Sequence, residues 1–215
     1  MKDSQALQNL LSQGLQQLGI ETSSLQEQQL MDYLLLLEKW NQAYNLTAVR
    51  DPREMISRHL LDSLAVLPYV ESGEITDIGS GAGLPGIPLA ILRPDLQVNS
   101  LDSNGKKTRF QFQVKAALAL DNFQVSQARV ENYQAATRSQ QLVSRAFASL
   151  KDFLTWTQPL AAEDARWLAM KGQYPYQEVE ELPEGFFVDL SHELKVPGQE
   201  GQRHLLIIRK QTEKG

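Results

Sequence analysis

The 215-residue sequence predicts an α/β fold in which a seven-stranded, largely parallel sheet carries helices on both faces. Three observations predict this fold. From Glu74 onward, β-prone runs alternate with stretches long enough for helices. The last two β-prone runs, residues 186–196 and 203–210, have no helix between them, so we expect an antiparallel hairpin. Residues 1–70 instead show the apolar spacing of helices.

The helical part comes first in the chain. Apolar side chains recur at helical spacing over residues 30–40, which predicts one buried stripe. A later helix is expected to begin at Asp51, because Asp is a favoured N-cap residue and Pro52 suits the first helical position. We therefore expect an N-terminal helical subdomain over residues 1–70 and a larger domain over residues 71–215.

The strands of the larger domain are predicted where β-prone runs lie between turn residues. Helical stretches of about ten or more residues fit between most of the first five runs, which favours parallel pairing. The expected strands are residues 74–79, 97–102, 123–128, 141–147, 165–171, 186–196 and 203–210.

Composition excludes several classes of protein. Hydrophobic residues make up 42% of the chain and charged residues 22%, which favours a packed core over disorder. Cysteine is absent, which excludes disulfides, thiolate metal sites and a cysteine nucleophile. The three histidines have no metal-ligand spacing, so we expect no metal. No run is long enough to span a bilayer and no signal peptide is evident, so a cytoplasmic protein is expected.

The net charge is −5, but the basic residues are unevenly distributed. Residues 71–150 carry eight Lys or Arg and seven Asp or Glu, whereas the segments on either side are acidic. Because phosphate binding needs a local basic patch and not a basic protein, the charge does not exclude a nucleic-acid partner.

The stretch "ITDIGSGAGLPGIPLAI", residues 75–91, places four glycines within eight residues after the first expected strand. In a doubly wound sheet such a turn lies at the carboxyl edge, where ligands bind. Glycine suits this place because a Cβ would obstruct the ligand or forbid the backbone angles of the turn. The stretch therefore predicts a cradle for a nucleotide-like molecule.

Two cofactors fit this cradle. Residues 81–86 match the dinucleotide pattern GxGxxG, and Asp102 follows about twenty residues later, as in NAD-binding proteins. A helix that began inside this motif would leave Pro88 well within it, where proline breaks a hydrogen bond. A helix that begins near Leu84 places Pro85 and Pro88 in its first turn, where proline is tolerated.

Asp77 favours the second cofactor. A buried carboxylate before the loop needs amide donors or an ammonium group, and a pyrophosphate would be repelled. The segment resembles "hhDhGxGxG", the first motif of class I S-adenosylmethionine-dependent methyltransferases. This resemblance implies that the loop holds the methionine half, Asp102 holds the ribose, and residues 129–133 flank the adenine, with Asp77 as a support. An NAD-dependent oxidoreductase remains the alternative.

Absent motifs narrow the acceptor of the methyl group. Methylation of cytosine C5 needs a cysteine nucleophile, and the exocyclic-amine motif [DN]PP[YF] is missing after the fourth strand, where "SRAFASL" stands. Arg145 occupies the place of the Asp that ribose methylation requires. A ring nitrogen such as guanine N7 needs no general base, only orientation. The sequence therefore favours N7 methylation.

Several longer runs resemble the bacterial small-subunit ribosomal RNA guanine-N7 methyltransferases, also called the glucose-inhibited division protein B family. This resemblance implies methylation of one guanine in the decoding-region loop of 16S rRNA, with S-adenosylmethionine as methyl donor, in the cytoplasm. It covers nearly the whole chain in order, over residues 39–64, 77–91, 101–110, 144–150, 170–173 and 201–210.

The resemblance also implies site residues, and no catalytic residue is assigned. Arg145, which is always charged, is expected to meet a carboxylate or an RNA phosphate. Val130 is expected to pack on the adenine, and Glu131 to reach its polar edge. Together with the fold argument, the expected cofactor contacts are Gly79, Gly81, Leu84, Asp102, Val130, Glu131 and Arg145.

Contacts to RNA are expected at Lys106, Arg109 and Lys171, all near the carboxyl edge of the predicted sheet. His59 and Asp62 lie three residues apart and are expected to form a structural hydrogen bond. The expected partner is 16S rRNA or the 30S subunit, bound by a monomer. A regulator that binds the cofactor without catalysis is a further alternative.

Overall fold

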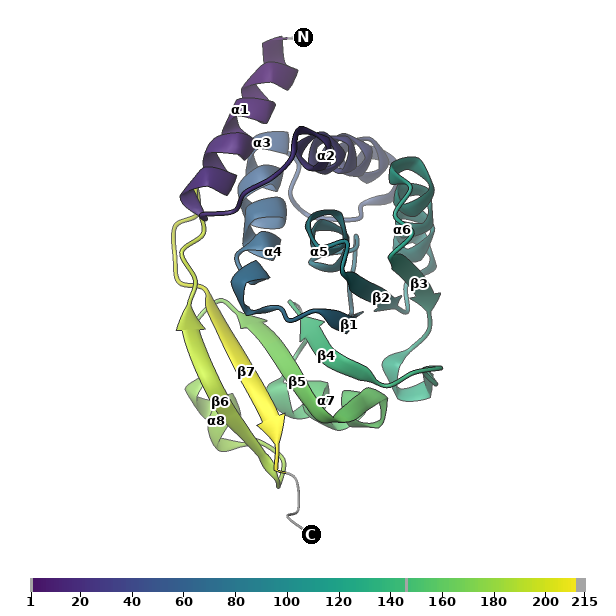
Figure 1. Ribbon diagram of the computed structural model, residues 1–215, viewed down its shortest axis with the longest axis vertical. Coiled ribbons are helices and arrows are strands. Elements are labelled where there is room, and N and C mark those ends of the chain that lie inside the picture. The colour runs from purple at the N-terminus through teal and green to yellow at the C-terminus, as the bar shows by residue number, and fades with distance from the viewer. Residues whose placement is uncertain (1, 146, 212–215) are drawn as a thin grey trace.

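The computed structural model describes residues 2–145 and 147–211 and contains the predicted mixed sheet (Figure 1). Its strands are β1 (Gly73–Ile78), β2 (Leu96–Asp102), β3 (Phe123–Gln127), β4 (Ser139–Ser144), β5 (Ala161–Lys171), β6 (Phe186–Glu193) and β7 (His204–Lys210). Their order is β3-β2-β1-β4-β5-β7-β6. The first five strands pair in parallel, and β7 is antiparallel to both β5 and β6. The predicted α/β fold and its C-terminal hairpin are confirmed.

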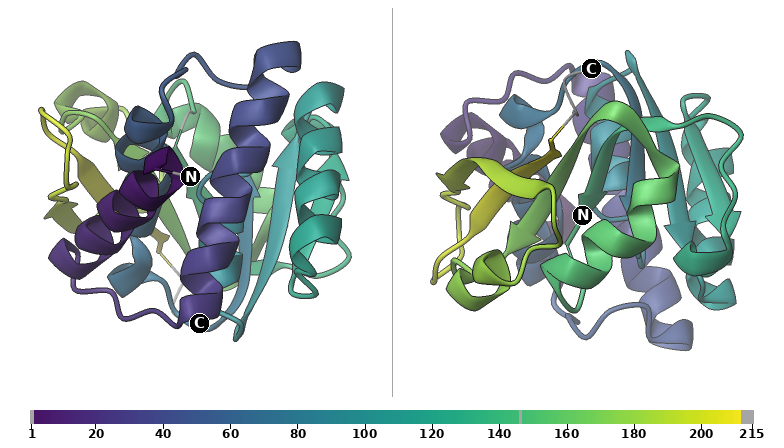
Figure 2. Two further views of the ribbon diagram at one scale, coloured as in Figure 1. Left: turned by 90° about the horizontal axis from the view of Figure 1, so that it is seen from above. Right: turned by 90° about the horizontal axis from the view of Figure 1, so that it is seen from below.

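Helices cover both faces of this sheet (Figures 1 and 2). One face carries the helices that precede β1 together with α5 and α6, and the opposite face carries α7. The α-helices are α1 (Lys2–Gln17), α2 (Ser24–Tyr44), α3 (Pro52–Met55), α4 (Asp62–Leu64), α5 (Gly86–Leu92), α6 (Gly105–Leu118), α7 (Leu150–Thr157) and α8 (Tyr176–Glu180). A π-helix, η1 (Ile56–Leu61), joins α3 to α4, and short 3₁₀ turns are η2 (Leu67–Tyr69), η3 (Val130–Asn132) and η4 (Gln158–Leu160).

The hydrophobic core is continuous across residue 70. Leu34 and Leu37 of α2 belong to the same buried cluster as Leu89 of α5 and Val98 of β2. Because apolar burial is the main stabilising contribution to folding, the N-terminal helices and this face of the sheet support each other. The boundary between residues 1–70 and 71–215 therefore remains a prediction, and residues 1 and 212–215 lie outside the described chain.

The helix start at Asp51 is confirmed. Its carboxylate accepts a hydrogen bond from the backbone N–H of Arg53 at 2.9 Å, and Pro52 is the first helical residue. The π-helix that follows was not predicted. Such wide turns are rare in proteins, and those that occur are often found at functional sites. They turn side chains away from the faces that a regular helix would give them.

Several predicted boundaries differ from the structure. β5 begins at Ala161 and not at residue 165, and β6 ends at Glu193 and not at residue 196. β4 ends at Ser144, whose hydroxyl donates to the carbonyl of Ile78 at 2.9 Å, so the predicted strand end at Phe147 is wrong; Ala146 lies outside the described residues. Helix α5 begins at Gly86 and not near Leu84, and the turn before it includes Gly83, whose φ is +90°.

Candidate functional site

The glycine-rich stretch forms the turn between β1 and α5, as predicted. The angle φ is +66° at Gly79, +60° at Gly81 and +90° at Gly83, a region in which a residue with a Cβ is strained. Tyr33 of α2 donates a hydrogen bond to the carbonyl of Ala82 at 3.0 Å. The N-terminal helices therefore help to hold this loop in place.

Helix α6 holds the loop from another side. The side-chain amide of Gln111 donates to the hydroxyl of Ser80 at 2.9 Å and to the carbonyl of Gly81 at 2.8 Å. Ser100 of β2 also donates to Ser80, at 2.6 Å. With these buried polar groups satisfied by one another, the loop has a defined shape before any ligand arrives.

Gly79 and Gly83 differ in what surrounds them. A Cβ on Gly83 would collide with the side chain of Ile87, which would have to shift, and the positive φ would add strain. A Cβ on Gly79 would meet no described atom within 4 Å. The outer face of the loop is thus open at Gly79, which is the clearance that the sequence predicts for a ligand.

A hollow of about 320 Å³ adjoins the open face of the loop, and we call it the glycine-loop hollow. Four of the seven predicted cofactor contacts line it: Gly79, Asp102, Val130 and Glu131. The remaining wall residues are Ile78, Leu101, Ser103, Ala128, Arg129, Phe147 and Trp156.

The other three predicted contacts lie elsewhere. Gly81 does not line the hollow, but its N–H donates to Asp102 Oδ2 at 2.8 Å. Leu84 is buried in the core, and Arg145 lines a second hollow. The structure therefore brings together the residues expected at the adenosine half of a cofactor. All seven contacts remain predictions.

Asp102 ends β2 with both carboxylate oxygens held in place. Oδ2 accepts from Gly81, and Oδ1 accepts from the backbone N–H of Asn104 at 2.8 Å. A carboxylate oxygen has two lone pairs, so each oxygen can accept one further hydrogen bond. Such an arrangement suits a pair of neighbouring hydroxyl groups.

Phe147 and Trp156 were missed in the sequence analysis. Their rings meet edge to face, with centroids 5.6 Å apart, and both line the glycine-loop hollow. Trp156 lies on α7 and is 39% exposed although it is large and apolar. No local pattern distinguishes it from a core residue, since its place beside Val130 depends on how α7 packs on the sheet.

Asp77 lies completely buried under the loop. Its Oδ2 accepts the N–H of Gly86 at 2.8 Å, whereas Oδ1 has no partner in the described chain. Burial raises the pKa of Asp77 from 3.8 to about 7, although the bond from Gly86 opposes this rise. An orphaned carboxylate oxygen beneath an open glycine loop fits a ligand that carries an ammonium group, as S-adenosylmethionine does.

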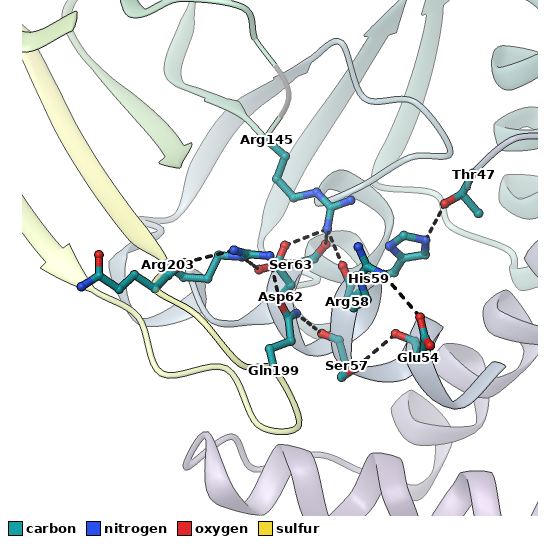
Figure 3. Close-up of polar contacts among 11 residues, drawn as sticks. Thr47, Glu54, Ser57, Arg58, His59, Asp62, Ser63, Arg145, Gln199 and Arg203 are labelled. Atoms are coloured by element: carbon teal, nitrogen blue, oxygen red, sulfur yellow. Dashed lines mark hydrogen bonds and ion pairs between the residues drawn. The ribbon is translucent and has the colours of Figure 1, made fainter. Parts of the chain in front are cut away.

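The second hollow, of about 350 Å³, lies at the same edge of the sheet, and we call it the arginine hollow (Figure 3). Arg145, directly after β4, donates from Nη1 to Asp62 Oδ2 at 2.9 Å, and Arg203 donates from Nε to Asp62 Oδ1 at 3.0 Å. Its lining consists of Val49, Arg58, His59, Asp62, Arg145, Met170, Lys171, Gly172, Leu194, Arg203 and His204. The two hollows are neighbours, because Arg145 lines one and Phe147 the other.

The predicted bond between His59 and Asp62 is wrong. His59 Nε2 instead bonds the hydroxyl of Thr47 at 2.9 Å, and both oxygens of Asp62 face arginines (Figure 3). The π-helix explains the difference, because its wider turn separates residues that a regular helix would place on one face. Burial, reinforced by Arg145, lowers the pKa of His59 from 6.5 to about 4, so its ring is neutral at pH 7.

The three residues predicted for RNA contact occupy two environments. Lys106 and Arg109 are both exposed on the first turn and a half of α6. Lys171 ends β5 and lines the arginine hollow, but its ammonium group pairs with both oxygens of Glu178, at 3.0 and 2.8 Å. Their role in RNA binding remains a prediction.

Residues 2–145 and 147–211 contain neither a metal centre nor a membrane-spanning helix. Within those ranges no group of three or more His, Asp or Glu side chains is placed to hold a metal ion. None of the helices there is both long enough and apolar enough to cross a membrane.

The parallel sheet, the glycine loop after β1 and the acid at the end of β2 define a class I methyltransferase. Solved structures agree with this fold. One is TrmN from Thermus thermophilus, at TM-score 0.57 and 16% identity, covering 73% of this chain and 53% of that one. Another is a TehB-like SAM-dependent methyltransferase from Corynebacterium glutamicum, at TM-score 0.56 and 16% identity, covering 74% and 94%.

A family model described as rRNA small subunit methyltransferase G matches residues 26–206. A ribosomal RNA small subunit methyltransferase G from Pseudomonas fluorescens (strain Pf0-1) is 58% identical over 200 residues, covering 93% of this chain and 94% of that protein. Its counterpart from Pseudomonas aeruginosa (strain LESB58) is 54% identical over 201 residues, covering 93% and 94%. The chain belongs to this family, and its methyl donor is S-adenosylmethionine. The oxidoreductase alternative is not favoured.

Proposed function

We propose that the protein transfers a methyl group from S-adenosylmethionine to N7 of one guanine in 16S rRNA. The observation that carries the proposal is the adjacency of two unlike hollows at one edge of the sheet. The first has two aromatic side chains beside an open glycine loop, and the second is lined by four Lys or Arg side chains. An adenosine fits the first, and a phosphate-bearing nucleotide fits the second.

In the glycine-loop hollow, each predicted contact has a physical role. The open face at Gly79 admits the donor against the loop, and the two held oxygens of Asp102 accept from ribose hydroxyls. Val130 packs on the adenine and Glu131 reaches its polar edge. Arg145, at the border of the hollows, binds the carboxylate of the methionine half.

S-adenosylmethionine, when bound, supplies an electrophilic methyl group on a positively charged sulfur. Guanine N7 has a lone pair in the base plane and carries no proton, so no residue need accept one. His59 is neutral, and Asp62 is fully engaged with two arginines, so the arginine hollow suits orientation better than proton transfer. The chain therefore acts by holding N7 in line with the methyl group.

RNA is held, in this proposal, by the cations around the carboxyl edge. Lys106 and Arg109 on α6 and Lys171 beside the arginine hollow contact phosphates. We propose a cytoplasmic enzyme that acts as a monomer on 16S rRNA or on the 30S subunit.

The test is mass spectrometry of 16S rRNA from a strain that lacks the enzyme, incubated with the protein and labelled S-adenosylmethionine. The proposal expects one 7-methylguanosine per rRNA molecule. Label on another atom of guanine would contradict the N7 assignment. Binding of the donor without any transfer would favour the regulator instead.

A further inference from the structure

Asp62 is an almost buried carboxylate that faces two arginines. Its side chain is 10% exposed, and its oxygens are divided between Arg145 and Arg203, whose side chains are 20% and 33% exposed. The single negative charge of Asp62 is paired with the two positive charges of Arg145 and Arg203, so this cluster keeps a net positive charge. Removing this carboxylate would leave two close cations without their anion.

The guanidinium of Arg145 is fixed at one end and free at the other. Its Nη1 donates to Asp62, to the carbonyl of Arg58 at 3.1 Å and to the hydroxyl of Ser63 at 3.5 Å (Figure 3). Within residues 2–145 and 147–211, Nε and Nη2 form no hydrogen bond. These two nitrogens form the edge of a guanidinium that binds a carboxylate in a bidentate manner.

Asp62 is itself held by a chain of contacts from the hairpin loop. Arg203 donates from Nη2 to the side chain of Gln199 at 2.9 Å, and Gln199 donates to the carbonyl of Ser57 at 2.7 Å. The loop between β6 and β7 is thereby hydrogen-bonded to the π-helix, and Asp62 is the residue directly after this helix. The orientation of the carboxylate is set by groups on three separate segments (Figure 3).

We propose that Asp62, braced by Arg203, is a positioning residue that directs the free edge of Arg145 to the carboxylate of the methyl donor. This inference rests on the proposed function, because it takes the ligand of Arg145 from there. Asp62 itself does not touch the donor. Its contribution is to restrict the rotation of a long side chain, so that less freedom is lost when the carboxylate binds.

Positioning and plain electrostatics predict opposite results for Asp62→Asn. If Asp62 only neutralised charge, its removal would make Arg145 more attractive to an anion, and affinity for the donor would rise. If Asp62 positions Arg145, the affinity falls. The sign of the change therefore separates the two roles.

The experiment compares two ligands by calorimetry: S-adenosylhomocysteine, and 5′-methylthioadenosine, which lacks the amino-acid part. For Asp62→Asn we expect about tenfold weaker binding of S-adenosylhomocysteine, as for a lost charge-assisted hydrogen bond. Binding of methylthioadenosine should be unchanged. A general loss of structure would weaken the binding of both ligands. Thermal unfolding of the variant checks for such a loss.

Three further variants complete the test. Asp189→Asn removes a carboxylate paired with Arg209 at 2.9 Å on the outer hairpin and should change neither affinity. Arg203→Gln removes only the contact that braces Asp62 and should weaken the binding of S-adenosylhomocysteine by a smaller factor. This variant replaces Asp62→Asn in the test if Asp62→Asn does not fold. In an Arg145→Ala background, Asp62→Asn should cause no further loss.

An unchanged or increased affinity of Asp62→Asn for S-adenosylhomocysteine would overturn the inference and leave the proposed function intact. An additional loss in the Arg145→Ala background would overturn it as well, because Asp62 would then act through another group. If the unaltered protein binds neither ligand, the proposed function itself fails.

Discussion

The two hollows at the carboxyl edge of the sheet are built in different ways. The glycine-loop hollow is formed by a bare loop, apolar side chains and the held carboxylate of Asp102. The arginine hollow is formed by long charged side chains, and two of its arginines share the single carboxylate of Asp62, which leaves a net positive charge. The first suits a neutral ring system by shape, and the second suits an anion by charge.

The buried carboxylates of the two regions show the same contrast. Asp62 has a cation on each oxygen, whereas Asp77 under the glycine loop has an oxygen with no partner in the described chain. A paired buried charge depends on its partners, and an unpaired one costs stability until a ligand supplies a partner. The comparison teaches that one buried carboxylate already has its partners within the described chain and the other does not.

The largest effect is expected from Gly79→Val, which fills the open face of the glycine loop. Affinity for S-adenosylhomocysteine should fall at least about a hundredfold, roughly 2.7 kcal/mol. Gly19→Val is a matched control, because Gly19 also has φ near +69° and open space around it. Both variants should lose similar stability on thermal unfolding, but only the first should lose binding. Retained affinity in Gly79→Val would show that the ligand lies elsewhere.

The contrast between the buried carboxylates predicts opposite effects of Asp→Asn on stability. Because the pKa of Asp77 is raised to about 7, the folded protein holds this proton more tightly than the unfolded chain between about pH 4 and pH 7. The free energy of unfolding therefore falls as the pH rises through that window. Asp77→Asn should be more stable than the parent at pH 8, by on the order of 2 kcal/mol, and Asp62→Asn less stable.

Urea unfolding between pH 5 and pH 8 measures the free energy of unfolding of both variants and of the parent. The advantage of Asp77→Asn should shrink as the pH is lowered from 7 towards 4, where the parent carboxyl is protonated. A constant difference at all pH values would show that Asp77 is not the titrating group. S-adenosylhomocysteine should also reduce the pH dependence of the parent, because its ammonium group compensates the orphaned oxygen.

The next smaller effect tests the apolar wall of the glycine-loop hollow. Trp156→Ala should weaken the binding of S-adenosylhomocysteine and of methylthioadenosine alike, by about tenfold. Both ligands carry the adenine that the indole ring would cover. Trp156→Phe should retain most of the affinity. Equal loss of the two ligands would distinguish this wall from Arg145, whose removal should affect only the ligand with a carboxylate.

The smallest effect is expected at the rim. Replacing Lys106 and Arg109 together with Ala should weaken RNA binding several-fold and reduce its salt slope by about one to two units, as for the loss of two phosphate contacts. The donor should bind unchanged. Arg138→Ala with Lys210→Ala, at the opposite edge of the sheet, is the matched control. An unaltered salt slope in the first variant would refute the proposed phosphate contacts.

The fold could be predicted in detail because its signals are local. Periodicity placed all seven strands, and Asp51 with Pro52 marked a helix start. The start of α5 was placed two residues too early, since proline is tolerated at several positions in the first turn and does not mark the first helical residue. The sequence pattern of the π-helix is the same as that of a regular helix. The bond predicted between His59 and Asp62 was wrong for this reason.

For this protein, the sequence alone determined the order of strands and helices, the bare loop after β1 and the acid that ends β2. These depend on residues close together in the chain. Only the tertiary structure decided the partners of Asp62, which come from 83 and 141 residues further along. Charge pairing acts through space and carries no periodicity, so the packing of three distant segments had to be known before Arg145 could be seen to have one edge held and one edge free.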